Sequence, residues 1–336
     1  MKPTEGFYEM QESALPYQAT IPFRQLVTSL RSLPQRLNLH QSRIEACLLT
    51  SESAITDSQP RAKKQDRREA TNSESSEGAE IPAQVSAPTK FLPIVLVGPH
   101  WHARESLQNI IVFGDSYSKS NEGQTWVDVI QQQLRSDTPN VSNLAFPGAT
   151  AETDFAYQLS GFLSKVDDKP GDSGEACLDP GEATYIIFFG INDCGAMGTE
   201  DLESIVEGIF DDLHRLYRKS NARNFVLFDV PPTDRSPQAV DSDLSAVLED
   251  NIKTWNDALR DQAAEFRSSN KDVTVFVFSA HQVLTDVLDD PLEYEFSEDD
   301  PAIEGGHIWE DGLHLTSDMH DILCKQLLTS ILADQL

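Results

Sequence analysis

The sequence predicts an α/β protein, in which a five-stranded parallel sheet lies between two layers of helices in a three-layer α/β/α sandwich. From residue 109 onward, short apolar runs alternate with longer amphipathic segments. Such strand–helix alternation builds a parallel sheet with helices on both faces. The apolar runs are continuous rather than alternating, which is typical of strands buried on both faces. The order of the segments and the character of the strands therefore predict the same fold class.

Five segments are predicted as buried strands. They are Asn109–Phe113, Val141–Ala145, Tyr185–Phe189, Phe225–Val230 and Val273–Phe278. Parallel strands all end at the same edge of a sheet, and ligands of open α/β sheets bind at that edge. We therefore expect the functional residues in the loops that follow these strands.

Three longer segments repeat apolar residues at helical spacing. They are Asp201–Ser220, Asp243–Phe266 and Asp318–Leu332, the last with Thr316 or Ser317 as its N-cap. The first stripe consists of Leu202, Ile205, Val206, Ile209, Phe210, Leu213, Leu216 and Tyr217. The second consists of Leu244, Val247, Leu248, Ile252, Trp255 and Leu259. The third consists of Met319, Ile322, Leu323, Leu327 and Ile331. These stripes are expected to cover the sheet.

The charge distribution divides the chain into two parts. Residues 1–93 hold 11 basic and 11 acidic side chains, whereas residues 94–336 hold 15 and 44. Residues 50–90 are rich in Ser, Glu, Gln and Ala, a composition typical of disorder. We predict a largely disordered N-terminal extension over 1–93 and one folded domain over 94–336. The net charge of −29 argues against nucleic-acid binding.

The sequence contains no recognisable targeting signal, and its four cysteines are scattered. No apolar run approaches the roughly 20 residues of a membrane-spanning helix, and the N-terminus lacks the apolar core of a secretory signal peptide. We therefore expect a cytoplasmic protein with reduced thiols. If the protein is secreted instead, Cys177 and Cys194 are a candidate disulfide and Asn140 a candidate glycosylation site.

Small and polar residues follow the first three predicted strands. Ser116 lies after the first strand, Gly148 in a turn after the second, and Asn192 directly after the third. Asp311 and His314 lie just before the last predicted helix. Each alone is more typical of a turn or a helix cap. Together they supply a nucleophile, an acid/base with its orienting carboxylate, and oxyanion donors.

Four blocks, FGDSYS, NLAFPGAT, FFGINDC and DGLHLT, resemble the SGNH (GDSL-type) hydrolase family over about residues 109–335. VPPTDRSP at 230–237 is similar to the fungal acetyl-esterase branch of that family. The resemblance implies a flavodoxin-like strand order and a serine esterase that needs no metal or organic cofactor. Tyr117 stands where the namesake motif has Leu. This departure removes no catalytic group and weakens an assignment to the lipase branches.

The resemblance also implies roles for these residues. Ser116 would attack an ester carbonyl, His314 would take and return the proton, and Asp311 would hold the imidazole tautomer. The backbone N–H groups of Ser116 and Gly148 and the amide of Asn192 would form the oxyanion hole.

The implied substrate is a short acyl ester, most simply an acetyl ester, of a carbohydrate or small alcohol. A lipase or thioesterase for longer acyl chains is the enzymatic alternative. The non-enzymatic alternative is a scaffold whose N-terminal extension binds a partner. The oligomeric state is left open.

Three histidines and a tryptophan outside these motifs are alternative candidates for functional residues. His100 and His102 flank Trp101 and suggest a metal site, but no third ligand is evident. Trp101 is expected to pack against the fold or to line the substrate side. His307 lacks an Asp three positions before it and is therefore a poorer base than His314.

Three residues beside the motifs have structural interpretations. Asp115 is expected to fix the Ser116 loop, Asp193 to cap the segment that follows it, and Cys194 to be a small buried residue. The run 286–311 holds eleven acidic residues and no Lys or Arg. It is expected to be a solvated surface loop. Any part of it that rims the site would disfavour anionic acyl groups.

Overall fold

The computed structural model describes residues 91–120, 123–134, 139–167 and 178–332. Most of the predicted extension over 1–93, including the segment 50–90, lies outside these ranges, as does Cys177. Phe91 is buried and its ring packs edge-on against His281, with 4.9 Å between the ring centroids. Among the described residues, no helix is long and apolar enough to cross a membrane.

Six strands form one sheet in the order β1-β6-β5-β4-β2-β3. The strands are β1 (Ile94–Leu96), β2 (Asn109–Gly114), β3 (Asn140–Asn143), β4 (Ala183–Phe188), β5 (Asn224–Phe228) and β6 (Thr274–Phe278). Strands β2 to β6 pair in parallel and correspond to the predicted strands. Taken in chain order, these five have the flavodoxin-like arrangement 2-1-3-4-5. The predicted fold class is therefore confirmed.

The predicted number of strands is corrected from five to six. The added strand, β1, is antiparallel to β6, with Val95 opposite Phe276. Its three residues are too few to give a strand pattern in the sequence, and Val95 is half exposed at this edge of the sheet. Hydrogen bonding to β6 therefore decides its conformation, rather than its own apolar pattern.

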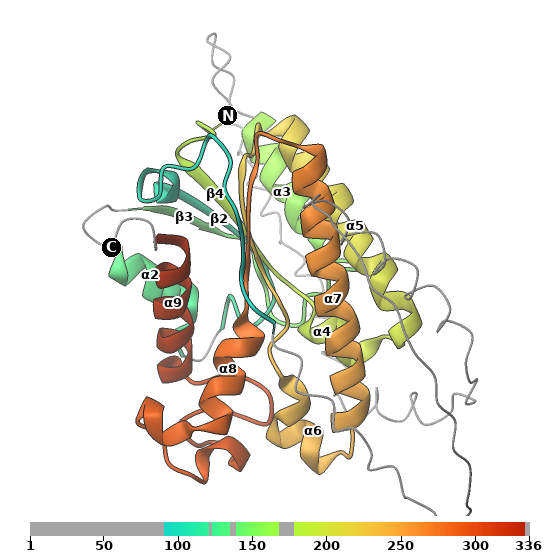
Figure 1. Ribbon diagram of the computed structural model, residues 1–336, viewed down its shortest axis with the longest axis vertical. Coiled ribbons are helices and arrows are strands. Elements are labelled where there is room, and N and C mark those ends of the chain that lie inside the picture. Colours follow the sequence, from blue (N-terminus) through green and yellow to red (C-terminus); the bar gives the residue numbers. More distant parts are fainter. Residues whose placement is uncertain (1–90, 121–122, 135–138, 168–177, 333–336) are drawn as a thin grey trace, which may run out of the picture. The chain divides into compact units, whose positions relative to one another are not determined.

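Helices cover both faces of the sheet (Figure 1). They are α2 (Trp126–Gln133), α3 (Phe155–Asp167), α4 (Ile191–Ala196), α5 (Thr199–Lys219), α6 (Pro237–Asp241), α7 (Ser245–Ser269), α8 (Ala280–Asp289) and α9 (Ser317–Leu332). Helices α2 and α9 pack together on one face, with α8 beside α9, and α3, α5 and α7 pack on the other. Four short 3-10 turns complete the described elements: Glu105–Leu107, Thr233–Arg235, Pro291–Tyr294 and Asp300–Ala302.

The three helices predicted from apolar stripes are α5, α7 and α9. The stripe of α5 from Leu202 to Leu216 is buried, and acidic residues in its first turn and basic residues in its last complement the helix dipole. Val247 is an exception in α7, because it is 48% exposed. It lies about 100° around the helix from Leu248, outside the face turned to the sheet.

Aromatic side chains pack in the centre of the molecule. The rings of Phe188 and Phe228, on neighbouring strands, are stacked with 4.6 Å between centroids. Trp126, the first residue of α2, packs against Phe228 at 5.0 Å. These contacts fix the start of α2 over the sheet, close in sequence to the loop that carries Ser116.

Candidate active site

Ser116 lies in a tight turn directly after β2. A Cβ atom at Gly114 would lie 2.7 Å from the Phe188 carbonyl oxygen, so a side chain does not fit at this position. The Asp115 carboxylate accepts a hydrogen bond from the Tyr117 backbone N–H at 2.9 Å. The turn, fixed by Asp115 as predicted, holds Ser116 at the carboxyl edge of the sheet.

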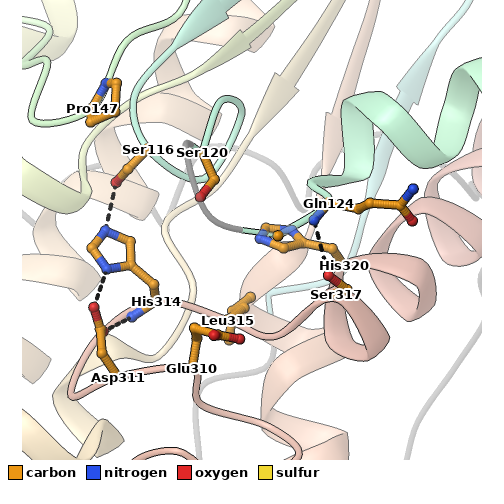
Figure 2. Close-up of a pocket in the computed structure, with 11 residues that line it drawn as sticks. Ser116, Ser120, Gln124, Pro147, Glu310, Asp311, His314, Leu315, Ser317 and His320 are labelled. Atoms are coloured by element: carbon orange, nitrogen blue, oxygen red, sulfur yellow. Dashed lines mark hydrogen bonds and ion pairs between the residues drawn. The ribbon is translucent and has the colours of Figure 1, made fainter.

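Asp311 and His314 share one loop before α9. Asp311 Oδ1 accepts hydrogen bonds from the backbone N–H groups of Leu313 and His314, at 2.8 and 2.7 Å. Its Oδ2 lies 2.8 Å from His314 Nδ1. His314 Nε2 lies 2.9 Å from Ser116 Oγ (Figure 2). The structure thus joins these three predicted site residues in a continuous hydrogen-bonded chain.

The charge of Asp311 determines the tautomer of His314. The hydrogen bond from His314 holds the pKa of Asp311 well below its usual range, although partial burial opposes this shift. An ionised carboxylate only accepts hydrogen bonds, so Nδ1 of a neutral His314 must carry the proton. Nε2 is then free to accept the proton of the Ser116 hydroxyl. A general base for a serine nucleophile needs this arrangement.

The predicted oxyanion donors lie on the loops after β2, β3 and β4. Within the described residues, the backbone N–H groups of Ser116 and Gly148 donate no hydrogen bond. Gly148 has a φ of +78°, in the left-handed region that favours glycine. Asn192 Nδ2 donates to the Ala149 carbonyl at 2.9 Å and lies 3.5 Å from Asp115 Oδ2. One N–H of the Asn192 amide is therefore committed to holding the loop after β3.

Two buried carboxyl groups lie beneath these loops. Asp193 accepts hydrogen bonds from the backbone N–H groups of Ala151 and Glu152, at 3.0 and 3.1 Å. This corrects the expectation that Asp193 caps the segment following it, because its carboxylate turns back to the loop after β3. Burial raises the pKa of Asp193 to about 6 and that of Asp115 to about 7. Mutual repulsion adds to the shift of Asp115.

A pocket of about 230 Å³ opens beside Ser116 and His314. It is lined by Ser116, Ser120, Gly123, Gln124, Pro147, Glu310, Asp311, His314, Leu315, Ser317 and His320 (Figure 2). Gly148 and Asn192 are not part of this lining. The pocket therefore lies toward α9 and the segment before α2, rather than toward Gly148 and Asn192.

The acidic run 286–311 is more structured than a solvated loop. It includes the end of α8 and two 3-10 turns, and Phe296 and Asp300 within it are buried. The Asp300 carboxylate accepts a hydrogen bond from the His307 backbone N–H at 3.1 Å. Glu310 and Asp311, at the end of the run, line the pocket. The expected solvation is confirmed for the acidic side chains, all of which except Asp300 are exposed, but the run is not a loop throughout.

The competing residues lie elsewhere. Trp101 packs against Phe276 on β6, with 4.8 Å between ring centroids. Cys194 is buried, and burial raises the pKa of its thiol. His314, and not His307, reaches Ser116. No three His, Cys, Asp or Glu side chains among the described residues gather as a metal site.

Two residues that support the site were not assigned these roles from the sequence. The Tyr117 hydroxyl donates to the Leu313 carbonyl at 2.7 Å, and so links the loops of Ser116 and His314. Gln158 on α3 holds Gly114 by accepting from its N–H at 3.0 Å and donating to its carbonyl at 2.8 Å. These pairs are 196 and 44 positions apart in the chain. The only sequence signal was Tyr117 itself, as a departure from the family motif.

The sequence model of the GDSL-like lipase/acylhydrolase family matches residues 110–327, more than half of the chain. The chain belongs to this family, and it is a carboxylic ester hydrolase. The resemblance seen in the four sequence blocks is therefore confirmed.

Several individual proteins are similar to this chain. An acetylesterase of Thermothelomyces thermophilus is 26% identical over 239 residues, which cover 56% of this chain and 76% of that protein. A catalytic mutant of an acetylxylan esterase from Geobacillus stearothermophilus superposes with a TM-score of 0.46 at 12% identity, covering 67% of this chain and 94% of that one. For a carbohydrate acetylesterase from Sinorhizobium meliloti the TM-score is 0.43 at 14% identity, with coverage of 67% and 99%.

Proposed function

We propose that the protein hydrolyses short acyl esters, most simply acetyl esters of a carbohydrate or small alcohol, with Ser116 as the nucleophile. The observation that carries this proposal is the hydrogen-bonded chain from Ser116 Oγ through His314 to Asp311, with distances of 2.9 and 2.8 Å. It lies at the carboxyl edge of the sheet, between the ends of β2 and β4, where the strand order reverses. Doubly wound sheets bind their ligands at such a point.

The reaction has two halves. Ser116 Oγ forms a bond to the ester carbonyl carbon while its proton passes to His314 Nε2. Collapse of the tetrahedral intermediate breaks the bond to the alcohol, which leaves with the proton from His314. A water molecule then gives a proton to His314 and attacks the acyl carbon. The bond from that carbon to Ser116 Oγ breaks, Oγ takes the proton back from His314, and the acid is released. Asp311 stays ionised and stabilises the imidazolium in both halves.

The negative charge on the carbonyl oxygen requires hydrogen-bond donors. The free backbone N–H groups of Ser116 and Gly148 supply two of them. An Asn amide carries two N–H bonds, and Asn192 commits one of them to Ala149. Its second N–H makes only a long hydrogen bond to Asp115 Oδ2, at 3.5 Å, and would exchange it for the carbonyl oxygen as the third donor in the proposed oxyanion hole.

The choice of substrate has two supports. The relative that is 26% identical is an acetylesterase. The pocket beside Ser116 has a volume of only about 230 Å³, and Glu310 and Asp311 line it. A small pocket favours a short acyl ester over a long chain, and the acidic rim disfavours anionic substrates.

The test is hydrolysis of p-nitrophenyl acetate, butyrate and octanoate by the wild-type protein and by Ser116→Ala. We expect activity that falls with acyl length and that is lost in Ser116→Ala. Ser160→Ala, an exposed serine on α3, serves as the matched control and should keep wild-type rates. Activity that survives in Ser116→Ala would refute the nucleophile, and highest activity on octanoate would favour a longer-chain lipase.

A further inference from the structure

The loop that follows β3 carries Gly148 and lies beside the nucleophile. Pro147, the residue before Gly148, lines the pocket next to Ser116 (Figure 2). Gly148 itself is exposed, and a Cβ atom there would meet nothing within 4 Å outside the adjoining residues. Packing around Gly148 therefore does not set the direction of its backbone N–H. Contacts elsewhere in the loop must do so.

Asp193, near the start of α4, makes two of these contacts. Its side chain is 0% exposed. Oδ2 accepts a hydrogen bond from the Ala151 backbone N–H at 3.0 Å, and Oδ1 accepts one from the Glu152 backbone N–H at 3.1 Å. Two successive backbone N–H groups that closely follow Gly148 are thus bound to one buried side chain.

Other hydrogen bonds hold the same loop. The Phe146 N–H donates to the last residue of β2 at 3.3 Å, and the Ala149 N–H donates to the Phe146 carbonyl at 3.3 Å. Both are long for N–H···O hydrogen bonds. Asn192 donates to the Ala149 carbonyl at 2.9 Å. Asn192 and Asp193, which are adjacent in the sequence, therefore hold the part of the loop that follows Gly148.

The Asp193 carboxylate is kept ionised at a cost. Burial raises the pKa of Asp193, so the ionised form is less favourable in the folded protein than in water. The hydrogen bonds from Ala151 and Glu152 offset part of this cost. An asparagine has nearly the same shape, but its side chain has only one acceptor oxygen. The carboxylate can accept from both N–H groups, whereas an asparagine could accept from only one.

We propose that Asp193 is a positioning residue for ester hydrolysis, because its two hydrogen bonds hold the loop so that the Gly148 N–H faces the carbonyl oxygen of the substrate. This inference rests on the proposed function, in which Gly148 is an oxyanion donor. The charge on that oxygen develops only in the transition state. A displaced Gly148 N–H therefore slows the reaction and has little effect on the binding of the ester.

The first test compares Asp193→Asn with wild type on p-nitrophenyl acetate. We expect kcat to fall about tenfold or more and KM to change less than about twofold, since small errors in the placement of a catalytic group are costly. Asp229→Asn is the matched control and should keep wild-type kcat and KM. Asp229 is also 0% exposed and also accepts two hydrogen bonds, but from Ser279 and His281, which follow β6.

A transition-state analogue separates positioning from a general loss of structure. Ser116 Oγ adds to the carbonyl carbon of 1,1,1-trifluoropropan-2-one, its proton passes to His314, and the carbonyl oxygen becomes an oxyanion. In Asp193→Asn the inhibition constant should rise by about the same factor as kcat/KM falls. A variant that is merely less folded would lose kcat in proportion to its folded fraction and would keep the wild-type inhibition constant.

A double-mutant cycle with Asn192→Ala identifies the donor through which Asp193 acts, because Asn192 is its neighbour in the chain. If Asp193 acts through Gly148, Asp193→Asn should still lower kcat about tenfold in the Asn192→Ala background. The absence of a further loss in that background would show that Asp193 acts through Asn192, and would overturn the inference.

Circular dichroism checks that Asp193→Asn folds. If it does not, Glu152→Pro decides, because it removes one of the two N–H donors at an exposed position. It should likewise lower kcat and weaken the binding of the analogue.

Wild-type kcat and a wild-type inhibition constant in Asp193→Asn would overturn the inference, as would equal losses in Asp193→Asn and Asp229→Asn. Ser116→Ala distinguishes this failure from failure of the proposed function. If Ser116→Ala abolishes activity while Asp193→Asn behaves like wild type, the proposed function stands and the positioning role fails. Activity that survives in Ser116→Ala refutes the proposed function itself.

Discussion

The Tyr117 hydroxyl donates a hydrogen bond to the Leu313 carbonyl oxygen at 2.7 Å. Tyr117 directly follows Ser116 and Leu313 directly precedes His314, so this bond joins the two loops that must meet for proton transfer. Tyr117 is buried, and burial together with the nearby charges of Asp115 and Asp311 raises the pKa of its hydroxyl well above the usual range. The hydroxyl therefore stays protonated and remains a donor. A leucine here could not make this bond.

Tyr117→Phe should lower kcat about tenfold with little change in KM, because small errors in the placement of reacting groups are costly. The phenyl ring keeps its packing, so the fold should be retained. Tyr217→Phe is the control: it also removes a tyrosine hydrogen bond, to Asp272 at 3.1 Å, but on the C-terminal part of α5. Steady-state kinetics on p-nitrophenyl acetate checks both. Equal kcat in the two variants would show that Tyr117 serves stability alone.

Asn192→Ala should lower kcat about a hundredfold, because loss of one oxyanion donor typically costs about 3 kcal/mol of transition-state stabilisation. KM should change little, since the charge on the carbonyl oxygen develops only in the transition state. Asn109→Ala, at the opposite end of β2, is the control and should keep wild-type kcat. A loss of less than about threefold in Asn192→Ala would remove this side chain from the oxyanion hole.

Gly190→Ala should destabilise the protein by about 2–4 kcal/mol, from backbone strain and overpacking together. Gly190 has a φ of +115°, and a Cβ atom there would lie 2.5 Å from both the Trp255 ring and Val230. Gly161→Ala on α3 is the control, because its Cβ would meet nothing within 4 Å. It should be neutral or stabilising. Urea denaturation of both variants gives the free energies of unfolding, and equal values would contradict this prediction.

The buried carboxyl group of Asp229 should make the free energy of unfolding depend on pH. Burial raises the pKa of Asp229 to about 7. Hydrogen bonds from His281 and Ser279 and the charge of Arg260 favour the ionised carboxylate, but they only partly offset the effect of burial. Because the folded-state pKa lies above the unfolded value of about 3.9, the folded state holds this proton more tightly. The resulting stability is fully present below about pH 4 and is lost as pH rises through about 7.

The free energy of unfolding should therefore fall less in Asp229→Asn than in wild type between about pH 5 and about pH 8. The difference should be of the order of a few kcal/mol, since one pKa unit corresponds to about 1.4 kcal/mol. Asp250→Asn, exposed on α7, should keep the wild-type pH dependence. Urea denaturation at both pH values measures all three proteins. Parallel curves for wild type and Asp229→Asn would show that Asp229 is already ionised at pH 5.

The fold class, the five parallel strands and the three long amphipathic helices could be predicted from the amino-acid sequence. These elements follow from the local spacing of apolar residues. The spacing can be recognised in a helix that buries one stripe and in a strand that buries both faces. The sequence also predicted Ser116, Asp311 and His314 as site residues, because each falls in a short motif at a predicted strand end or helix start, and the structure brings the three side chains together. The spacing of Asp311 and His314 was informative because one loop carries both of them.

The distant groups that support this site became apparent only in the folded chain. Three hydrogen-bonded pairs join residues 42 to 196 positions apart in the chain. They are Tyr117 with Leu313, Gln158 with Gly114, and Asp193 with Ala151. No local pattern encodes such pairs, because each depends on where the sheet places the loops. The same holds for β1, whose strand conformation comes from pairing with β6.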